Sequence, residues 1–294
     1  MTRLAIFIIW LLHWLPLPVL SLFGRFLGAL SYFFVLPRKR VAATNLALCF
    51  PDLDASARRR LLWRHFQMLG CSTLERGLLW WASPERLRRI IRFEGEEYLL
   101  ALVQAGTPVI LLAPHFIGLD AGGARAAMSV DAVSMYARQK RNPVLNDRLY
   151  RGRKRFGDQT LLSRQDGVRD VVRAMKSGRP FYYLPDMDYG RKDAIFVPFF
   201  GVEAATITGL SRLARLTGAQ VLPCVTRRLP GGAGYVLEIG KAWENFPTAD
   251  VEADTRRMNG WIEGVARTMP EQYYWVHRRF KTRPAGQAGV YRDQ

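Results

Sequence analysis

The sequence predicts an α/β fold in which a mixed sheet is flanked by helices, with an apolar helix at the N-terminus. From residue 96 onward, short apolar runs that are typical of buried strands alternate with helical patterns. Before that part, residues 4–23 carry no formal charge and are rich in Leu, Ile, Phe and Trp. Because 49% of the 294 residues are hydrophobic, the chain is long enough and apolar enough to bury a large core.

The order of the elements follows from these patterns. Helices are expected at residues 56–81, 96–104, 143–156, 167–176, 207–216 and 251–269, and strands at 107–113, 131–137, 159–162, 180–184, 220–226 and 235–239. The last two strands flank Pro230-Gly231-Gly232, a turn sequence that predicts a hairpin. The polar stretch after Pro284 is expected to be loose.

The N-terminal run is expected to attach the chain to a membrane. Residues 4–23 are about long enough to span a bilayer, and Trp10 and Trp14 suit its interface. Pro16 and Pro18 would kink a helix, so a bent or half-inserted anchor is an alternative. A signal peptide and a buried core helix are less favoured, because no A-x-A site follows and the run is apolar all round. We therefore divide the chain into an anchor with its juxtamembrane segment, 1–36, and a domain, 37–294.

The charge of the chain indicates an anionic partner. Lys and Arg number 43 against 25 Asp and Glu, a net charge of +18, which favours nucleic acid, anionic lipid or an acidic protein. A cluster of cations at residues 38–40 follows the apolar run and only Arg3 precedes it, which predicts that the main body faces the cytoplasm. The three cysteines are far apart, which indicates a reducing compartment and argues against zinc.

Two further features of the N-terminal third are given no catalytic role. Gly24 and Gly28 form a G-x-x-x-G pattern, but Arg25 lies inside it, so we assign it no function. The helix expected at 56–81 carries an arginine cluster that indicates either a solvated face or lipid contact. His65 lies among these arginines and is expected at the surface.

The strongest candidates for chemistry are His115 and Asp120, in A-P-H-F-I-G-L-D. They follow the buried strand at 107–113, and glycines at 118–123 allow a substrate to approach closely. Five residues span about 140° of a regular helix, so the two side chains meet only if His115 lies in the turn and Asp120 in the first helical turn. That geometry predicts a general base and the carboxylate that orients it. The alternative is a polar loop histidine, since the spacing alone is common.

Three other clusters are candidates for binding. Arg151, Arg153, Lys154 and Arg155 form either a generic basic surface or an anion clamp. Asp186 and Asp188 follow a strand; D-x-D can hold a divalent metal, but we favour a turn that lines the site, because no third ligand is evident. Residues 273–281 mix aromatic residues with cations, a pattern more typical of a core or membrane-facing strand than of base stacking.

With these blocks in view, the chain resembles the late acyltransferases of lipid A biosynthesis, the lauroyl and myristoyl transferases of Gram-negative bacteria. Several stretches carry the resemblance: the strand into A-P-H-F-I-G-L-D, G-R-K-R, P-D-M-D-Y-G-R-K-D-A-I-F-V-P-F-F-G, T-x-T-G and Q-Y-Y-W-V-H-R-R-F-K-T-R-P. Their order and the N-terminal anchor match too, over essentially the whole chain. Many members have Glu where this chain has Asp120.

The resemblance implies a glycerolipid-acyltransferase-like fold and a cytoplasmic-face enzyme of the inner membrane. The acyl donor would be acyl carrier protein, which is acidic, and the acceptor a Kdo-bearing lipid A precursor. No metal or organic cofactor is implied. His115 and Asp120 would be catalytic, and the substrates would contact Arg153, Asp186, Asp188, Arg278 and Arg279.

Two other functions stay open at this point. The same pair would serve acyl transfer to a lysophospholipid or a mannosylated inositol lipid. A basic membrane-bound protein that binds nucleic acid without catalysis would use the charge and the aromatic tail, but it leaves the buried strand and His115 unexplained. We therefore expect membrane lipids, and no nucleic acid, among the partners.

Overall fold

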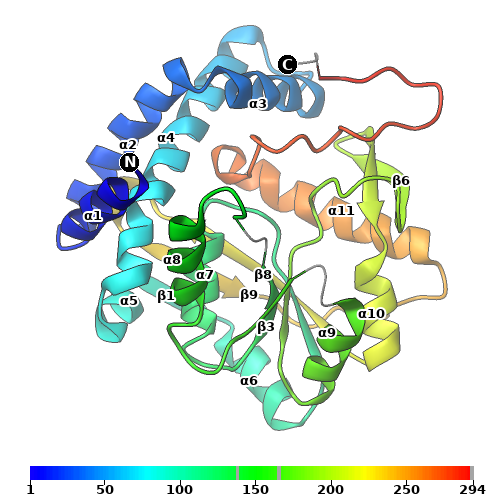
Figure 1. The fold of residues 1–294 in the computed structure, drawn as a ribbon. Coiled ribbons are helices and arrows are strands. Elements are labelled where there is room, and N and C mark those ends of the chain that lie inside the picture. Colours follow the sequence, from blue (N-terminus) through cyan, green and yellow to red (C-terminus); the bar gives the residue numbers. More distant parts are fainter. Residues whose placement is uncertain (137–138, 164–166, 292–294) are drawn as a thin grey trace.

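The computed structural model describes residues 1–136, 139–163 and 167–291, and it confirms a mixed sheet flanked by helices (Figure 1). The helices are α1 (Thr2–Leu12), α2 (Leu17–Phe34), α3 (Leu36–Cys49), α4 (Ala55–Trp81), α5 (Pro84–Ile90), α6 (Glu96–Gln104), α7 (Leu119–Ala126), α8 (Pro143–Arg153), α9 (Gly167–Lys176), α10 (Gly209–Thr217) and α11 (Val251–Thr268). The strands are β1 (Ile91–Glu94), β2 (Val109–Leu112), β3 (Val133–Met135), β4 (Thr160–Leu162), β5 (Phe181–Tyr183), β6 (Ala194–Phe199), β7 (Val202–Ile207), β8 (Gln220–Arg228) and β9 (Tyr235–Ile239). Two 3-10 turns are η1 (Pro230–Gly232) and η2 (Pro270–Gln272).

The main sheet has the strand order β1-β9-β8-β2-β5-β3-β4. Neighbouring strands are parallel except β8 and β9, which form the antiparallel hairpin expected around Pro230. Since β2 and β5 are parallel neighbours, the loops that follow them leave the same edge of the sheet. These loops carry His115 and Asp186.

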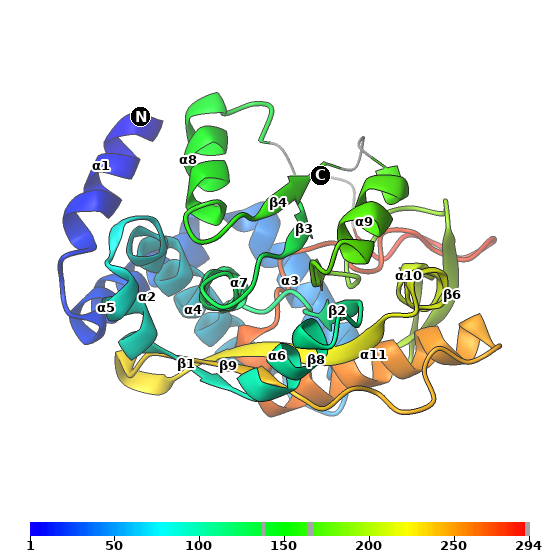
Figure 2. The same cartoon turned by 90° about the horizontal axis from the view of Figure 1, so that it is seen from below.

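The core lies on both faces of the sheet, as the alternation of β2 shows. Val109 and Leu111 pack in a cluster with residues of α6 and α7, whereas Ile110 and Leu112 pack in one with residues of α9, α10 and α11. Figure 2 shows the sheet between α7 and α11. All four side chains are at most 1% exposed, so β2 is a rigid support for the loop after it.

Most of the expected elements are confirmed to within a few residues. The expected strand at 131–137 corresponds to β3, and its last residue, Ala137, lies outside the described residues. The sequence patterns missed α3, α5, β1 and the separate β6–β7 hairpin. The expectation of a loose C-terminus is wrong for Tyr291, which packs against the core and whose hydroxyl bonds to Asn45 Oδ1 at 2.5 Å.

The apolar N-terminal run forms two helices: α1 ends at Leu12, and after a short turn α2 begins at Leu17 with Pro16 as its N-cap. By length and composition alone α2 could cross a membrane, but α1 has only 11 residues. The inner face of α2 packs along α4 through glycines. A Cβ atom on Gly28 would lie 2.1 Å from the carbonyl oxygen of Phe66, and one on Gly70 would lie 2.1 Å from that of Gly24. The G-x-x-x-G pattern thus packs α2 against α4, a role that the sequence alone does not indicate.

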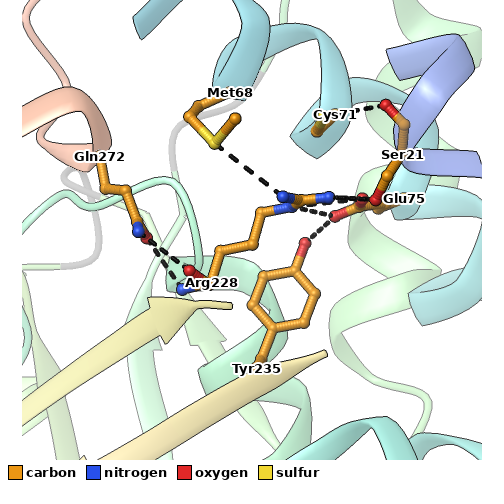
Figure 3. A network of polar contacts seen from close by, with 7 residues as sticks. All are labelled: Ser21, Met68, Cys71, Glu75, Arg228, Tyr235 and Gln272. Carbon is orange, nitrogen blue, oxygen red and sulfur yellow. Dashed lines mark hydrogen bonds and ion pairs between the residues drawn. The ribbon is translucent and has the colours of Figure 1, made fainter. Parts of the chain in front are cut away.

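A buried ion pair joins these helices to the sheet (Figure 3). The Arg228 guanidinium, at the end of β8, contacts Glu75 of α4 at 2.6 and 3.0 Å, and both side chains are 3% exposed. The hydroxyls of Ser21, on α2, and Tyr235, on β9, complete the network. Because a buried charge without its partner is strongly destabilising, this network fixes α2 and α4 against the end of the β8–β9 hairpin.

His65 is not at the surface as expected. It is fully buried, and its ring Nδ1 contacts the carbonyl oxygen of Glu271 at 3.0 Å. Burial lowers the pKa of His65 from 6.5 to about 4. The neighbouring arginines indicate an exposed position, but they lie on the outer face of α4, whereas His65 lies on its inner face.

We expect Gly28→Ala to lower the free energy of unfolding by about 1–3 kcal/mol or more, since the new methyl group meets backbone that cannot move without separating α2 from α4. The matched control is Gly260→Ala in α11, where nothing lies within 4 Å of the added Cβ. That change should be neutral or stabilise by about 0.5–1 kcal/mol. Thermal unfolding of the full chain in detergent measures both, and equal effects would contradict the close packing of the two helices.

A second prediction concerns pH. Because the pKa of His65 is lower in the folded chain than when unfolded, the unfolded state binds more protons between pH 6.5 and 4, and stability falls as the pH drops through that window. The expected loss for this histidine at pH 5 relative to pH 7 is about 2 kcal/mol. His65→Gln should remove this part of the difference in melting temperature between pH 7 and pH 5. An unchanged difference would show that His65 is not buried in its neutral form.

Candidate active site

His115 lies in the loop between β2 and α7, and this loop is held by the segment after η2. The backbone N–H of Tyr274 donates to the His115 carbonyl oxygen at 3.0 Å, and that of Ile117 donates to the Gln272 carbonyl oxygen at 2.8 Å. Between these two bonds, Phe116 and Tyr273 form an antiparallel bridge. The aromatic block at 273–281 is therefore a core segment whose backbone holds the His115 loop in place.

Asp186, in the loop after β5, holds His115 with both carboxylate oxygens. Oδ1 lies 2.7 Å from the ring Nδ1, and Oδ2 accepts from the His115 backbone N–H at 2.8 Å. The Asp186 side chain is 1% exposed and that of His115 is 18% exposed. Burial opposes ionisation of Asp186, but the His115 charge and the two hydrogen bonds outweigh it, so the pKa of Asp186 is lowered from 3.8.

This contact fixes the chemistry that His115 can perform. An ionised carboxylate only accepts hydrogen bonds, so Nδ1 of His115 carries the proton that faces Asp186. The neutral ring then has its basic lone pair on Nε2. Such a pair can take a proton from a bound hydroxyl at Nε2 and stabilise the imidazolium that results.

Asp120 lies in the first turn of α7, as expected, but its carboxylate pairs with two arginines. Oδ1 accepts from Arg153 of α8 at 2.9 Å, and Oδ2 lies 3.6 Å from a guanidinium nitrogen of Arg76 of α4. Burial opposes ionisation of Asp120, but the charges of Arg153 and Arg76, and more weakly that of His115, lower its pKa from 3.8. The hydrogen bond to His115 that the spacing predicted for Asp120 is made in the structure by Asp186.

Two of the other candidates are engaged by the protein itself. Arg279 is 3% exposed and donates to the carbonyl oxygen of Ala205 and to the Thr206 hydroxyl, both at 2.8 Å. The carboxylate of Asp188 accepts from the backbone N–H groups of Gly190 and Thr282 and from the Thr282 hydroxyl. Arg279 therefore joins the C-terminal segment to the β6–β7 hairpin, and Asp188 joins that segment to the β5–β6 loop, whereas we expected both side chains to face a substrate.

Arg278 and Arg153 are more accessible. Arg278 is half-buried, with its guanidinium 5.9 Å from the centre of the Tyr291 ring. The Arg153 side chain is 36% exposed and that of Arg76 is 37% exposed. Around Asp120 two cations therefore face one anion at the surface, which leaves an excess positive charge for an anionic ligand.

A small cavity of about 10 Å³, which has room for about one water molecule, lies beside His115 and Asp186. Its lining includes His115, Asp186, Asn45 and His277. His277 Nε2 accepts from the Asp188 backbone N–H at 2.9 Å, and burial, the Arg279 charge and the His115 charge lower the pKa of His277 to about 4. His277 is therefore neutral at pH 7. A substrate must reach His115 from its exposed side.

Three residues that shape the site were not predicted from the sequence. Arg76 stands alone in the second half of α4, so no cluster marked it. Asn45 donates to the carbonyl oxygens of Trp275 and His277 at 2.6 and 2.7 Å, from a helix that no pattern predicted. His277 was visible only as part of an aromatic and basic block. In the described part of the chain, no group of three or more His, Cys, Asp or Glu side chains is arranged to hold a metal ion.

Comparisons with known proteins agree on one family. The family described as bacterial lipid A biosynthesis acyltransferase matches residues 1–282. The lipid A biosynthesis lauroyltransferase of Escherichia coli K12 is 36% identical over 287 residues, 97% of this chain and 93% of that protein. The lipid A biosynthesis palmitoleoyltransferase of the same organism is 35% identical over 292 residues, which are 99% of this chain and 94% of that protein.

A further relative and one solved structure are more distant. The lipid A biosynthesis myristoyltransferase of Escherichia coli K12 is 28% identical over 281 residues, 94% of this chain and 84% of that protein. The crystal structure of the 1-acyl-sn-glycerophosphate acyltransferase PlsC from Thermotoga maritima covers 85% of this chain and 96% of that chain, with 14% identity and a TM-score of 0.38, too slight a likeness to carry an argument.

Proposed function

Since the chain belongs to the bacterial lipid A biosynthesis acyltransferases, an enzyme family, we propose that it transfers a fatty acyl chain of the lauroyl or myristoyl class from acyl carrier protein to a hydroxyl of a Kdo-bearing lipid A precursor. We place the reaction at the cytoplasmic face of the inner membrane. The single observation that carries the chemistry is the His115 Nδ1 to Asp186 Oδ1 contact of 2.7 Å.

The proposed reaction is direct acyl transfer without an acyl-enzyme. His115 Nε2 takes the proton of the acceptor hydroxyl as its oxygen attacks the thioester carbonyl carbon. The C–S bond then breaks, and the thiolate takes the proton from the imidazolium as the ester forms. Asp186 holds the ring through Nδ1–H and stabilises its charge during the step, which is the part that we had assigned to Asp120.

Asp120 has a different part in this proposal. It neutralises one of the two arginines beside it and holds the planar guanidinium groups of Arg153 and Arg76 in place. Arginine forks match the oxygens of phosphate groups, so the excess charge supports binding of the acceptor's phosphates or sugar acid. Support for an acyl carrier protein donor comes from the net charge of +18, which would steer an acidic protein toward the enzyme.

A prediction of this mechanism separates the roles of the two carboxylates, Asp186 and Asp120. Asp186→Asn should lower kcat by about 10²–10⁴-fold, because the amide cannot hold the Nδ1–H tautomer and stabilise the imidazolium, while KM changes little. Asp120→Asn should act more on the acceptor's KM, because it disturbs Arg153 and Arg76. Steady-state kinetics with acyl carrier protein donor and purified acceptor measure both. The opposite pattern, with Asp186→Asn nearly as fast as wild type, would return the orienting role to Asp120.

A further prediction concerns acceptor recognition by Arg153. Arg153→Ala should raise the acceptor's KM by about tenfold or more, with a smaller effect on the donor's, because a contact present equally before and during the reaction changes KM rather than kcat. Arg151→Ala is the matched control: it lies on the same helix, with a 71% exposed side chain paired to Asp147. If Arg153→Ala weakens only the donor, this cluster binds acyl carrier protein instead.

The acceptor itself is identified by two assays. Purified enzyme is offered acyl carrier protein donor with a lipid A precursor and a lysophospholipid in competition. Mass spectrometry of lipid A from cells lacking the protein then gives the missing chain from the mass lost and its position from fragmentation. Preferred transfer to the lysophospholipid, with unchanged lipid A, would overturn the proposed acceptor.

A further inference from the structure

The outer faces of α1 and α2 form an apolar surface that nothing in the described chain covers. On α2, Leu22, Phe23 and Phe26 are 47–68% exposed. Phe7, on α1, is 51% exposed, and Trp14, in the turn between the two helices, is 69% exposed. Large apolar side chains gathered in this way mark a binding surface.

The inner face of α2 is fixed to the body of the protein from one end to the other. At its start, a Cβ atom on Gly232 of the β8–β9 turn would lie 2.6 Å from the Pro18 Cα, and Ser21 belongs to the buried network of Figure 3. In its middle, Gly28 touches the backbone of α4. Near its end, the Tyr32 ring lies 5.7 Å from that of Phe66. The helix therefore does not leave the globular body at any point.

Two consequences make a crossing of the bilayer by α2 unfavourable. If α2 crossed, the adjoining part of α4 would enter the hydrocarbon with it, together with the Glu75–Arg228 pair and the exposed Arg64. Arg25, which is exposed, stands at the middle of α2 and would lie near the bilayer centre. A charged arginine at the bilayer centre is strongly disfavoured.

We propose that α1 and α2 lie in the plane of the membrane, with their outer faces sunk into one leaflet of anionic phospholipid, and that neither helix crosses it. This rests on the proposed membrane attachment and specifies its form. The charges fit this occupant: Arg3, Arg25, Arg38 and Arg40 are exposed, and no acidic residue precedes Asp52. In a helix that lies in the interface, Arg25 reaches the headgroup phosphates along its aliphatic stem.

The same arrangement brings the active site to the membrane surface. α3 follows α2 directly, and Arg38 donates to the Val276 carbonyl oxygen at 3.1 Å, one residue before His277 in the segment that supports His115. The site thus lies close to the end of α2, where Phe33 and Phe34 are exposed. A lipid acceptor in that leaflet can present its headgroup to His115 while its chains stay in the membrane.

Cysteine labelling tests the topology in sealed inverted inner-membrane vesicles, whose cytoplasmic face is outside. The native cysteines, Cys49, Cys71 and Cys224, are all buried, so they give little background. We expect Arg3→Cys and Arg40→Cys to react equally with a membrane-impermeant maleimide, with no gain after detergent. Arg3→Cys reacting only after detergent would show that the N-terminus crosses the membrane.

A second variant, Trp14→Cys, tests whether α1 and α2 both cross the membrane as a helical hairpin. Position 14 lies in the turn between the two helices and would then face the periplasm. In intact spheroplasts the impermeant maleimide should leave it unlabelled, and labelling there would overturn the proposal. Phe26→Glu should weaken binding of the full chain to phosphatidylglycerol vesicles at least tenfold. Leu216→Glu, on α10 with a similarly exposed side chain, should not.

Acyl transfer measured in detergent tests the proposed reaction separately from the proposed membrane arrangement of α1 and α2. If the full chain washes off the vesicles with high salt, the leaflet proposal fails even when acyl transfer in detergent persists. If labelling shows one-sided access but no acyl transfer occurs, the proposed reaction fails and the topology stands.

Discussion

The buried Glu75–Arg228 pair is the interaction on which the arrangement of the other parts depends. It joins a long helix to the end of a central strand, and both charges are removed from water. Such a pair costs desolvation free energy that only its full set of hydrogen bonds repays, so its surroundings must stay closed and in register. Ser21 and Tyr235 supply those bonds, and for that reason α2 and β9 are held at the same point.

From this pair the connection continues to the catalytic loop. Gln272 accepts from the Arg228 backbone N–H at 2.8 Å and donates to its carbonyl oxygen at 2.9 Å. The backbone carbonyl oxygen of Gln272 in turn accepts a hydrogen bond from the backbone N–H of Ile117, two residues after His115. A single hydrogen-bonded path thus links the helix proposed to lie in the membrane with the loop of the general base. The parallel strands β2 and β5 set the other side of that loop, so His115 is held between two rigid supports.

Much of this could be predicted from the sequence, where the information is local. The alternation of strands and helices predicts the sheet, and the apolar strand before His115 predicts that this histidine lies at the end of a buried strand. The partner of His115 was harder, because the spacing to Asp120 is a short-range pattern, whereas Asp186 reaches His115 only through the pairing of β2 with β5. Side chains 71 residues apart carry no shared local signal.

The other differences have equally specific causes. Whether His65 and Arg279 are buried depends on which helix face or loop packs against the core. The arginine-rich sequence around each residue does not indicate this face. The β6–β7 hairpin turns at Phe200 and Gly201, both with positive φ, and a phenylalanine there gives none of the usual turn signal. Gly24 and Gly28 were set aside because of Arg25, yet the arginine points away from the face that the glycines pack.

The central claim is that His115, held by Asp186, removes the proton from the acceptor hydroxyl. A single-turnover measurement tests it most directly: enzyme in excess over the acyl carrier protein donor, with a lipid A precursor, comparing wild type with His115→Ala at pH 7. The account predicts that the variant, folded to the same melting temperature, transfers the acyl chain about 10²–10⁴-fold more slowly. A folded His115→Ala variant that transfers the chain at nearly the wild-type rate would contradict it.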